Sequence, residues 1–325
     1  MLLTRLNSHR MFFFCLLTAF ILTAGQLATD SFAGPRQKTF ASPEEAFRAL
    51  YDAVKSGSDR DLIFVLGPGS RGLVSSGDKV DDKARRERFL KSWVKENRIE
   101  SVNPEKAVLH IGDREFPFPI PVLKKKGAWV FDAREGREEI LNRRIGRNEL
   151  KVIEVLHEYT DAQREYASKD CNGNGVMDYA QRFISSKGKK DGLFWDASGG
   201  EESPFGPLIA KAAKEGYSDK QHDIKQHDIG VSSPYHGYYY RILTSQGKHA
   251  DGGAFDYKVN GRMVLGFALI AYPAKYGSSG VMTFIVNQEN VVFEKDFGRD
   301  TAKKASLIKT FDPDETWKKV EQAGM

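Results

Sequence analysis

Four short segments rich in aromatic and β-branched residues constrain the fold more than any other part of the chain. They cover residues 234–243, 263–273, 276–287 and 291–295, and glycine, proline and asparagine separate them. Segments of this composition and spacing are typical of β-strands joined by short turns. The sequence therefore predicts an antiparallel meander in the carboxy-terminal part of the chain.

A long helical pattern, from Glu135 to Ser168, precedes the meander. Apolar residues recur at helical spacing from Val152 to Tyr166, which predicts that one face of this helix packs on the meander. Gly136 and Gly146 predict breaks or bends, because glycine is a poor helix former. A further capped helix is predicted near the end of the chain, over residues 311–320.

Helices come before strands in the preceding part of the chain. Ser42 and Glu45 form a capping box at the start of an apolar helical period, and a second helix is predicted after Asp81. Strands are predicted over residues 107–111, 116–123 and 128–131. This order resembles the cone-shaped nuclear-transport-factor-like or cystatin-like fold.

The predicted fold class is therefore α+β. We expect a signal peptide over residues 1–33, a cone-like helix-plus-sheet domain over residues 34–134, and a long helix packed on an antiparallel sheet over residues 135–325. Such cones often hold a pocket, and His110 with Asp59 or Asp61 is a candidate lining. The alternative for His110 is a solvated strand position, because it alternates with the apolar Leu109 and Ile111.

The first residues carry an export signal. Arg5 and Arg10 precede an apolar segment over residues 11–24, and small residues before Gly34 offer a cleavage site near Ala33. The apolar segment is shorter than the about 20 residues that a membrane-spanning helix needs. We expect a periplasmic or secreted protein with no membrane span after cleavage.

The charge and the cysteine content limit the kinds of partner and the covalent cross-links that we expect for this chain. Removing residues 1–33 lowers the formal net charge from +5 to +4, and both signs are mixed along the chain, so no nucleic-acid partner is expected. Cys171 is then the only thiol, which excludes an internal disulfide. A basic cluster at the join of the two predicted domains is predicted to form a solvated or inter-domain ion-paired face; the alternative is an anion site. Its residues are Arg143, Arg144, Arg147 and Lys151.

The segment Asp170-Cys-Asn-Gly-Asn-Gly-Val-Met-Asp178 has the spacing of a calcium loop. Oxygen ligands fall at alternate positions and a glycine stands sixth, as such loops require. Gln181 occupies the twelfth position, where a bidentate glutamate is usual. The alternative is a turn whose side chains bond their own backbone. The candidate Ca²⁺ ligands are Asp170, Asn172, Asn174, the Val176 carbonyl and Asp178.

The densest aromatic cluster of the chain begins the meander. Aromatic side chains supply large contact areas, so an exposed part of this cluster would bind a glycan or a peptide. The alternative is that these residues are half-buried strand positions. The candidate binding residues are Tyr235, His236, Tyr238 and Tyr240.

Several motifs together resemble a known family. They include Phe118-Pro-Ile-Pro121, Gly192-Leu-Phe-Trp195, the segment 234–244 and the segment 261–277. With these motifs the chain resembles the exported bacterial domain-of-unknown-function family numbered 2950. The resemblance covers nearly all of the mature chain and implies no activity.

A weaker resemblance concerns the carboxy-terminal half. A helix with Gln163 and Tyr166, an Asn-Gly loop and the strands that follow are similar to the globular heads of bacterial pseudopilins. Those heads pack a helix on an antiparallel sheet. This resemblance implies the same arrangement here, without the apolar helix that assembles a filament.

No Gly-x-Ser-x-Gly elbow, no His-Glu-x-x-His motif and no Walker loop occurs in the sequence. This favours a non-enzymatic binding or assembly module of the envelope with a protein partner. The alternative function is a small-ligand-binding or hydrolytic protein that uses a pocket in the amino-terminal domain.

Overall fold

The structure is a computed structural model that describes residues 37–196, 200–217 and 233–321. The predicted signal peptide lies outside the described residues. Within them, no helix has both the length and the apolar character needed to cross a bilayer. Residues from Gln37 onward belong to one contact unit, which contains two hydrophobic cores.

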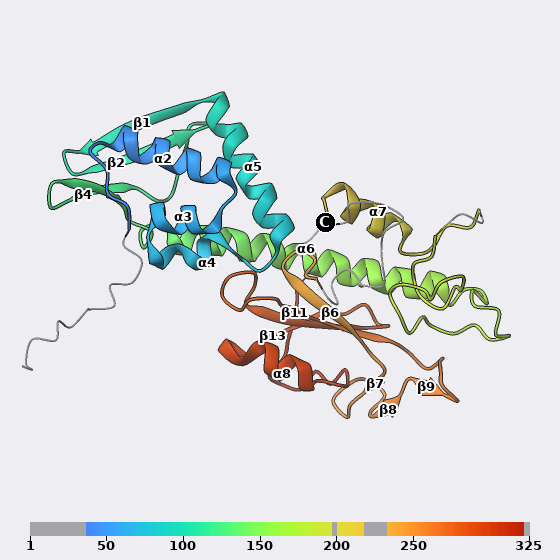
Figure 1. Ribbon diagram of the computed structural model, residues 1–325. Helices are drawn as coiled ribbons and strands as arrows, with labels where there is room; N and C mark the ends of the chain where they lie inside the picture. Colours follow the sequence, from blue (N-terminus) through green and yellow to red (C-terminus); the bar gives the residue numbers. More distant parts are fainter. Residues whose placement is uncertain (1–36, 197–199, 218–232, 322–325) are drawn as a thin grey trace, which may run out of the picture. The chain divides into compact units, whose positions relative to one another are not determined.

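Helices α2 (Pro43–Ser56), α3 (Asp59–Leu66), α4 (Arg71–Val74) and α5 (Lys79–Lys95) form the first part of the described chain (Figure 1). The predicted cap of α2 is present, since the Glu45 amide donates to Ser42 Oγ at 3.2 Å and the Glu45 carboxylate accepts from the Ala41 amide at 2.9 Å. Apolar residues at helical spacing, such as Leu50 and Val54, then enter the first core.

The first sheet is antiparallel and runs in the order β1-β2-β4-β5, with β3 paired to β2. Its strands are β1 (Asn97–Asn103), β2 (Lys106–Ile111), β3 (Phe116–Pro117), β4 (Val122–Lys125) and β5 (Ala128–Phe131).

Two details of this sheet differ from the sequence prediction. Strand β1 was not predicted, because it is an exposed edge strand of largely polar residues without apolar alternation. The single strand predicted over residues 116–123 is divided into β3 and β4, because the prolines in it cannot donate to a ladder.

Helix α6 (Arg137–Tyr166) is continuous over its whole length, so the predicted break at Gly146 is wrong. Gly136 instead precedes the helix in a left-handed conformation, with φ at 78°, and a Cβ there would lie 2.0 Å from the Pro119 carbonyl oxygen. Ile140 of α6 packs on the first core, whereas Val152 belongs to the second core. One helix therefore contributes to both cores.

The second sheet confirms the antiparallel arrangement. Its order is β14-β13-β12-β11-β6, in which β11, β12 and β13 pair in chain order and β6 pairs with β11 across four intervening short strands. Helix α6 contacts β12, and α8 (Thr301–Leu307) contacts β11 (Figure 1). The strands are β6 (Tyr238–Leu243), β11 (Ala268–Pro273), β12 (Met282–Asn287), β13 (Phe293–Asp296) and β14 (Lys318–Lys319).

Short elements complete the carboxy-terminal part. Helix α7 (Gly206–Lys214) precedes the second sheet. The connection between β6 and β11 holds two pairs, β7 (Ser245–Gln246) with β8 (Phe255–Asp256), and β9 (Lys258–Val259) with β10 (Arg262–Met263).

The helix predicted over residues 311–320 is absent. Those residues form turns and β14, where Lys319 pairs with Phe293. Without β14, strand β13 would be the edge of the sheet with unpaired backbone N–H and C=O groups. Pairing with β14 satisfies these groups, and this outweighs the helix-capping signal in residues 311–320. The α+β class is confirmed, and the likeness to pseudopilin heads stays a prediction.

Candidate functional site

A pocket with a volume of about 160 Å³ lies beside the first core. Helices α2 to α6 and the segment between β3 and β4 contribute its lining. The apolar side chains come in helical pairs, such as Leu50 with Val54 and Leu62 with Leu66, because residues four apart share a helix face. The apolar lining is Leu50, Val54, Leu62, Leu66, Leu73, Val74, Phe89, Phe118, Ile120 and Ile140.

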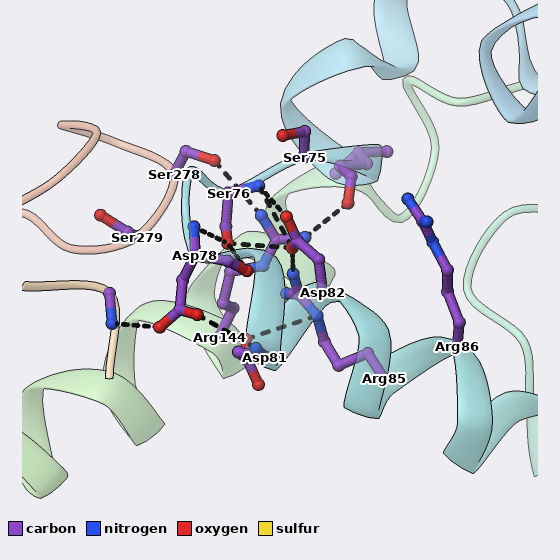
Figure 2. Close-up of polar contacts among 12 residues, drawn as sticks. Ser75, Ser76, Asp78, Asp81, Asp82, Arg85, Arg86, Arg144, Ser278 and Ser279 are labelled. Carbon is purple, nitrogen blue, oxygen red and sulfur yellow. Dashed lines mark hydrogen bonds and ion pairs between the residues drawn. The ribbon is translucent and has the colours of Figure 1, made fainter. Parts of the chain in front are cut away.

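Four charged residues complete the lining. Asp82, Arg85 and Arg86 come from consecutive turns of α5, and Arg144 comes from α6. Figure 2 shows Asp82, Arg85 and Arg144 in one cluster of polar contacts, with Arg86 apart from it. The pocket therefore has an apolar lining and a charged wall.

Asp82 is fully engaged at this wall. Its carboxylate accepts hydrogen bonds from the Ser76 amide at 3.0 Å and the Ser76 hydroxyl at 2.9 Å, and it forms an ion pair with Arg85. The side chain is 8% exposed. Buried carboxylates are stable only when paired and hydrogen-bonded in this way.

Arg144 is the most deeply buried cation of the wall. It is 2% exposed and donates to the Gly72 carbonyl at 2.9 Å, the Leu73 carbonyl at 2.5 Å and Ser278 Oγ at 3.2 Å. Burial lowers the pKa of Arg144 to about 10, so its side chain keeps its charge at neutral pH. The sequence prediction of a solvated or ion-paired face is wrong for this residue.

Two nitrogen atoms at the wall have no hydrogen-bond partner. They are Nη1 of Arg85 and Nε of Arg144, and both are buried. Arg86 differs, because it donates to the Gly57 carbonyl at 2.7 Å and pairs with Asp59. One buried acceptor, Asp81 Oδ2, also lacks a hydrogen-bond partner and lies 3.5 Å from Arg85 Nε, so these unbonded atoms belong to the packed interior of the wall.

Asp78 extends the polar cluster away from the pocket. Its Oδ2 accepts from the Tyr217 hydroxyl at 2.8 Å and from the Gly237 amide at 2.9 Å, while its Oδ1 caps α5 (Figure 2). Burial raises the pKa of the Asp78 carboxyl. These bonds connect the start of α5 to Tyr217 and to Gly237, the residue before β6. Asp78 therefore stabilises the packing between these segments and does not line the pocket.

The tyrosines predicted to bind a glycan or a peptide are buried. Tyr235, Tyr238 and Tyr240 are at most 4% exposed and belong to the second core. Tyr235 and Tyr240 line an enclosed cavity of about 30 Å³, which has room for about one water molecule. Their side chains therefore offer little contact area to an outside partner.

His236 is also largely buried, next to these tyrosines. Its backbone is left-handed, with φ at 50°, and its Nε2 lies 3.4 Å from a Glu215 carboxylate oxygen. Burial lowers the pKa of His236 to about 4. The imidazole is therefore neutral at physiological pH.

The Asp170 loop is held by its own side chains. The Asp170 carboxylate accepts from the Asn174 amide at 3.0 Å and the Gly175 amide at 2.8 Å. The side chains of Asn172 and Asn174 both reach the Asp178 carboxylate, at 2.9 and 3.0 Å. The loop therefore has the hydrogen bonds of the turn that the sequence offers as the alternative to a calcium loop. The side chains of Asn172 and Asn174 also converge on the Asp178 carboxylate.

The rest of the calcium pattern is less complete. Gln181, at the twelfth position, donates to the Gly261 carbonyl at 2.8 Å and so points away from the loop. Among the described residues, no group of three or more His, Cys, Asp or Glu side chains has a geometry that would hold a metal ion. The side chains of Asp170, Asn172, Asn174 and Asp178 and the Val176 carbonyl stay the predicted ligands, and all four side chains take part in the hydrogen bonds of the turn.

The residues proposed to line a cone pocket lie elsewhere. His110 contacts the Glu115 carbonyl at 2.9 Å and the Glu100 carboxylate at 2.7 Å, on the β1–β2 surface. Asp61 lines a different, open surface groove of about 450 Å³ between α2 and α3, where its carboxylate accepts a hydrogen bond from the Ser56 hydroxyl. Asp59 pairs with Arg86.

The sequence prediction named a pocket in this part of the chain but not its charged wall. The signal available was local: Asp82 and Arg85 stand three residues apart before the apolar Phe89, which places all three on one face of a helix. Nothing in the sequence indicated that Arg144 joins them.

Comparisons with known proteins complete the description. Searches of curated proteins and of solved structures gave no match. The chain matches the family described as "Protein of unknown function (DUF2950)" over residues 37–320. Because this match covers most of the chain, the protein belongs to the DUF2950 family, as its motifs predicted.

Proposed function

We propose that this is an exported, non-enzymatic binding protein that holds a small amphipathic ligand in the pocket beside α5. The observation that carries the proposal is the combination of an apolar lining with one charged wall. Ligand sites in proteins typically combine a mostly apolar concave surface with a few placed polar groups.

The lining favours binding over hydrolysis. Asp82 is its only acidic side chain, and Ser76 and Arg85 already engage that carboxylate. The lining contains no serine, cysteine, histidine or lysine, so it presents no nucleophile with an adjacent base. A general acid–base mechanism also needs a titratable group within reach of the substrate, and the arginines are poor candidates because they stay protonated.

The pocket is open to solvent on one side, so its size limits only the part of a ligand that it can enclose. An engineered apolar cavity of about 150 Å³ binds benzene, and the pocket here is about 160 Å³. Typical drug-sized sites are larger, at about 300–1,000 Å³. A ligand with an apolar part of about six carbon atoms is therefore the appropriate probe.

Methyl NMR spectra of the mature chain test this proposal. We expect that hexanamide, a neutral six-carbon probe, shifts the methyl signals of lining residues such as Leu66 and Val74. Signals of Val94 and Leu307, which are exposed and do not line the pocket, are the internal control. Shifts spread equally over the surface, or no shifts, would refute the proposal.

Two further roles stay proposals. The first is a protein partner in the envelope, which crosslinking in the living cell would capture. Because Tyr238 and Tyr240 are buried, another surface would have to make the contact.

The second is a weak structural calcium site at the Asp170 loop. Its support is the convergence of Asn172 and Asn174 on Asp178, since amide oxygen and nitrogen positions are interchangeable.

A further inference from the structure

Strand β1 is an open edge of the first sheet. It pairs with β2 on one side, and no other strand of the described residues pairs with it. Six of its seven residues are exposed, and Figure 1 shows it at one side of the sheet. An edge strand presents unpaired backbone N–H and C=O groups, which can pair with a strand of another chain.

This edge has few of the features that protect an edge strand from pairing. It contains no proline and no lysine, and its seven residues exceed the length of a short protected edge. A β-bulge interrupts it only near its end, between Ser101 and Asn103. Residues 97–101 therefore form a regular edge that another strand can join.

The hydrogen bonds to β2 decide which residues of β1 point their backbone outward. The Glu96 carbonyl accepts from the Gly112 amide at 3.0 Å, so this position bonds toward β2. Bonding alternates along an antiparallel strand, so every second residue from Asn97 directs its N–H and C=O away from β2. The outward residues are Asn97, Ile99 and Ser101.

These outward groups match a second copy of the same strand. If two β1 strands run antiparallel with Ile99 opposite Ile99 of the second copy, Asn97 lies opposite Ser101, and all outward groups are paired. In the same register Arg98 lies opposite Glu100, at the closer spacing of about 4.5 Å between Cα atoms. Opposite charges at directly opposed positions stabilise a strand pair.

Both charged side chains are available for this contact. Arg98 is 46% exposed and Glu100 is 47% exposed. Their contacts within the chain are with Glu115, 2.7 Å from Arg98, and with His110, 2.7 Å from Glu100. About half of each side chain therefore remains open to a second chain. Ile99 instead packs on the first core.

We propose that β1 is a dimerisation edge, at which two copies of this chain pair their β1 strands antiparallel about Ile99. The two first sheets then form one continuous sheet, and the two-fold symmetry closes both open edges. No residue of β1 lines the pocket, so this proposal is independent of the proposed ligand.

Sedimentation velocity of the mature chain over a concentration series tests the proposal. A single strand pair buries less area than a standard interface, so we expect a dissociation constant on the order of 1–100 μM. Glu100→Arg places like charges opposite each other and should weaken the dimer at least about ten-fold, and Arg98→Glu should do the same. Asp161→Arg, a charge reversal at a 73% exposed site on α6, should have no effect.

Mixing the two variants tests the register. Neither Glu100→Arg nor Arg98→Glu is complementary to itself, but in a mixed dimer each arginine lies opposite a glutamate. We therefore expect an equimolar mixture to dimerise about as tightly as the native chain. This recovery also shows that both variants are folded.

Cysteine pairing locates the two-fold axis. In a Cys171→Ser background, Ile99→Cys places two thiols on residues whose Cα atoms are about 5.5 Å apart, which suits a disulfide. Asn97→Cys is the matched control on the same strand, because its two copies would lie about 13 Å apart. Mild oxidation should cross-link Ile99→Cys and not Asn97→Cys.

Three results would overturn the proposal. The first is a native chain that stays monomeric at concentrations well above the expected dissociation constant. The second is a dimer that Glu100→Arg leaves unchanged, since the copies would then pair through another surface. The third is a mixture of Glu100→Arg and Arg98→Glu that does not recover the dimer, since the register would then be different.

Discussion

The Nη1 atom of Arg144 lies 3.2 Å from the hydroxyl oxygen of Ser278, although 134 positions separate the two residues. The same guanidinium bonds the Gly72 and Leu73 carbonyls and lines the pocket. Arg144 therefore holds α4 and the β11–β12 turn against α6, and it also lines the pocket.

Because Arg144 holds three segments together, we expect its replacement to lower the stability of the fold strongly. Arg144→Met leaves the Gly72 and Leu73 carbonyls and Ser278 without their donor, so we expect a loss of roughly 3–5 kcal/mol in the free energy of unfolding. Urea denaturation measures this. Arg143→Met is the control, since Arg143 is 56% exposed and should change stability by less than about 0.5 kcal/mol. Similar losses in both variants would contradict the prediction.

Stability should depend on pH through His236. Burial holds the pKa of the His236 imidazole in the folded chain at about 4, below its ordinary value of 6.5. The unfolded chain therefore binds a proton that the folded chain does not, and stability falls as pH falls from about 6.5 to about 4, by up to roughly 3 kcal/mol. The groups that influence it are Glu215, Lys151, Lys211, Asp81 and Glu154.

Denaturation of His236→Asn at several pH values isolates this effect. Asparagine tolerates the left-handed backbone at this position and does not titrate. Burial raises the pKa of Glu215, which has the opposite dependence, but that contribution is common to both proteins. We expect the difference between variant and native chain to change across this pH range. A constant difference would show that His236 does not titrate as described.

Two left-handed glycines provide a matched pair. A Cβ at Gly237, where φ is 77°, would lie 2.7 Å from Asn148 Nδ2 and 2.9 Å from Ser279 Cβ, whereas a Cβ at Gly277, where φ is 68°, meets nothing within 4 Å. We expect Gly277→Ala to cost roughly 1–2 kcal/mol from backbone strain alone. Gly237→Ala should cost roughly 1–3 kcal/mol more from crowding. Thermal melts of both variants measure the difference, and equal losses would exclude the crowding.

The calcium proposal predicts a small, specific stabilisation. Calcium at about 1 mM, a concentration typical for extracellular sites, should raise the free energy of unfolding by roughly 1 kcal/mol. Asp178→Asn should abolish this increase, and Asp161→Asn, an exposed change on α6, should not. No response to calcium, or an equal response to magnesium, would leave the loop as a hydrogen-bonded turn only.

Local patterns predicted much of the fold. The meander follows from its strand composition, and the cap of α2 follows from Ser42 and Glu45, because each signal acts within a few residues. Strand β1 escaped prediction because it is exposed and lacks alternation. The terminal strand β14 escaped because pairing with β13 decides it, and that pairing is not local.

The candidate site was harder to predict for the same reason. Val54, Arg85 and Arg144 belong to three different helices, and only tertiary packing brings them to one pocket. The basic residues around Arg144 have the composition of a solvated face. The burial of Arg144 depends on carbonyls of α4 and on Ser278, which the sequence pattern of α6 does not reveal.

Blocking the pocket tests the central claim most directly. Val54→Phe places a ring among the lining residues, and Val94→Phe makes the same change at an exposed position of α5. Calorimetric titration with hexanamide should show binding to the native chain and to Val94→Phe, and at least about ten-fold weaker binding to a folded Val54→Phe, since the ring takes the space of the ligand. Unchanged affinity in Val54→Phe, or no binding to the native chain, would contradict a ligand site in this pocket.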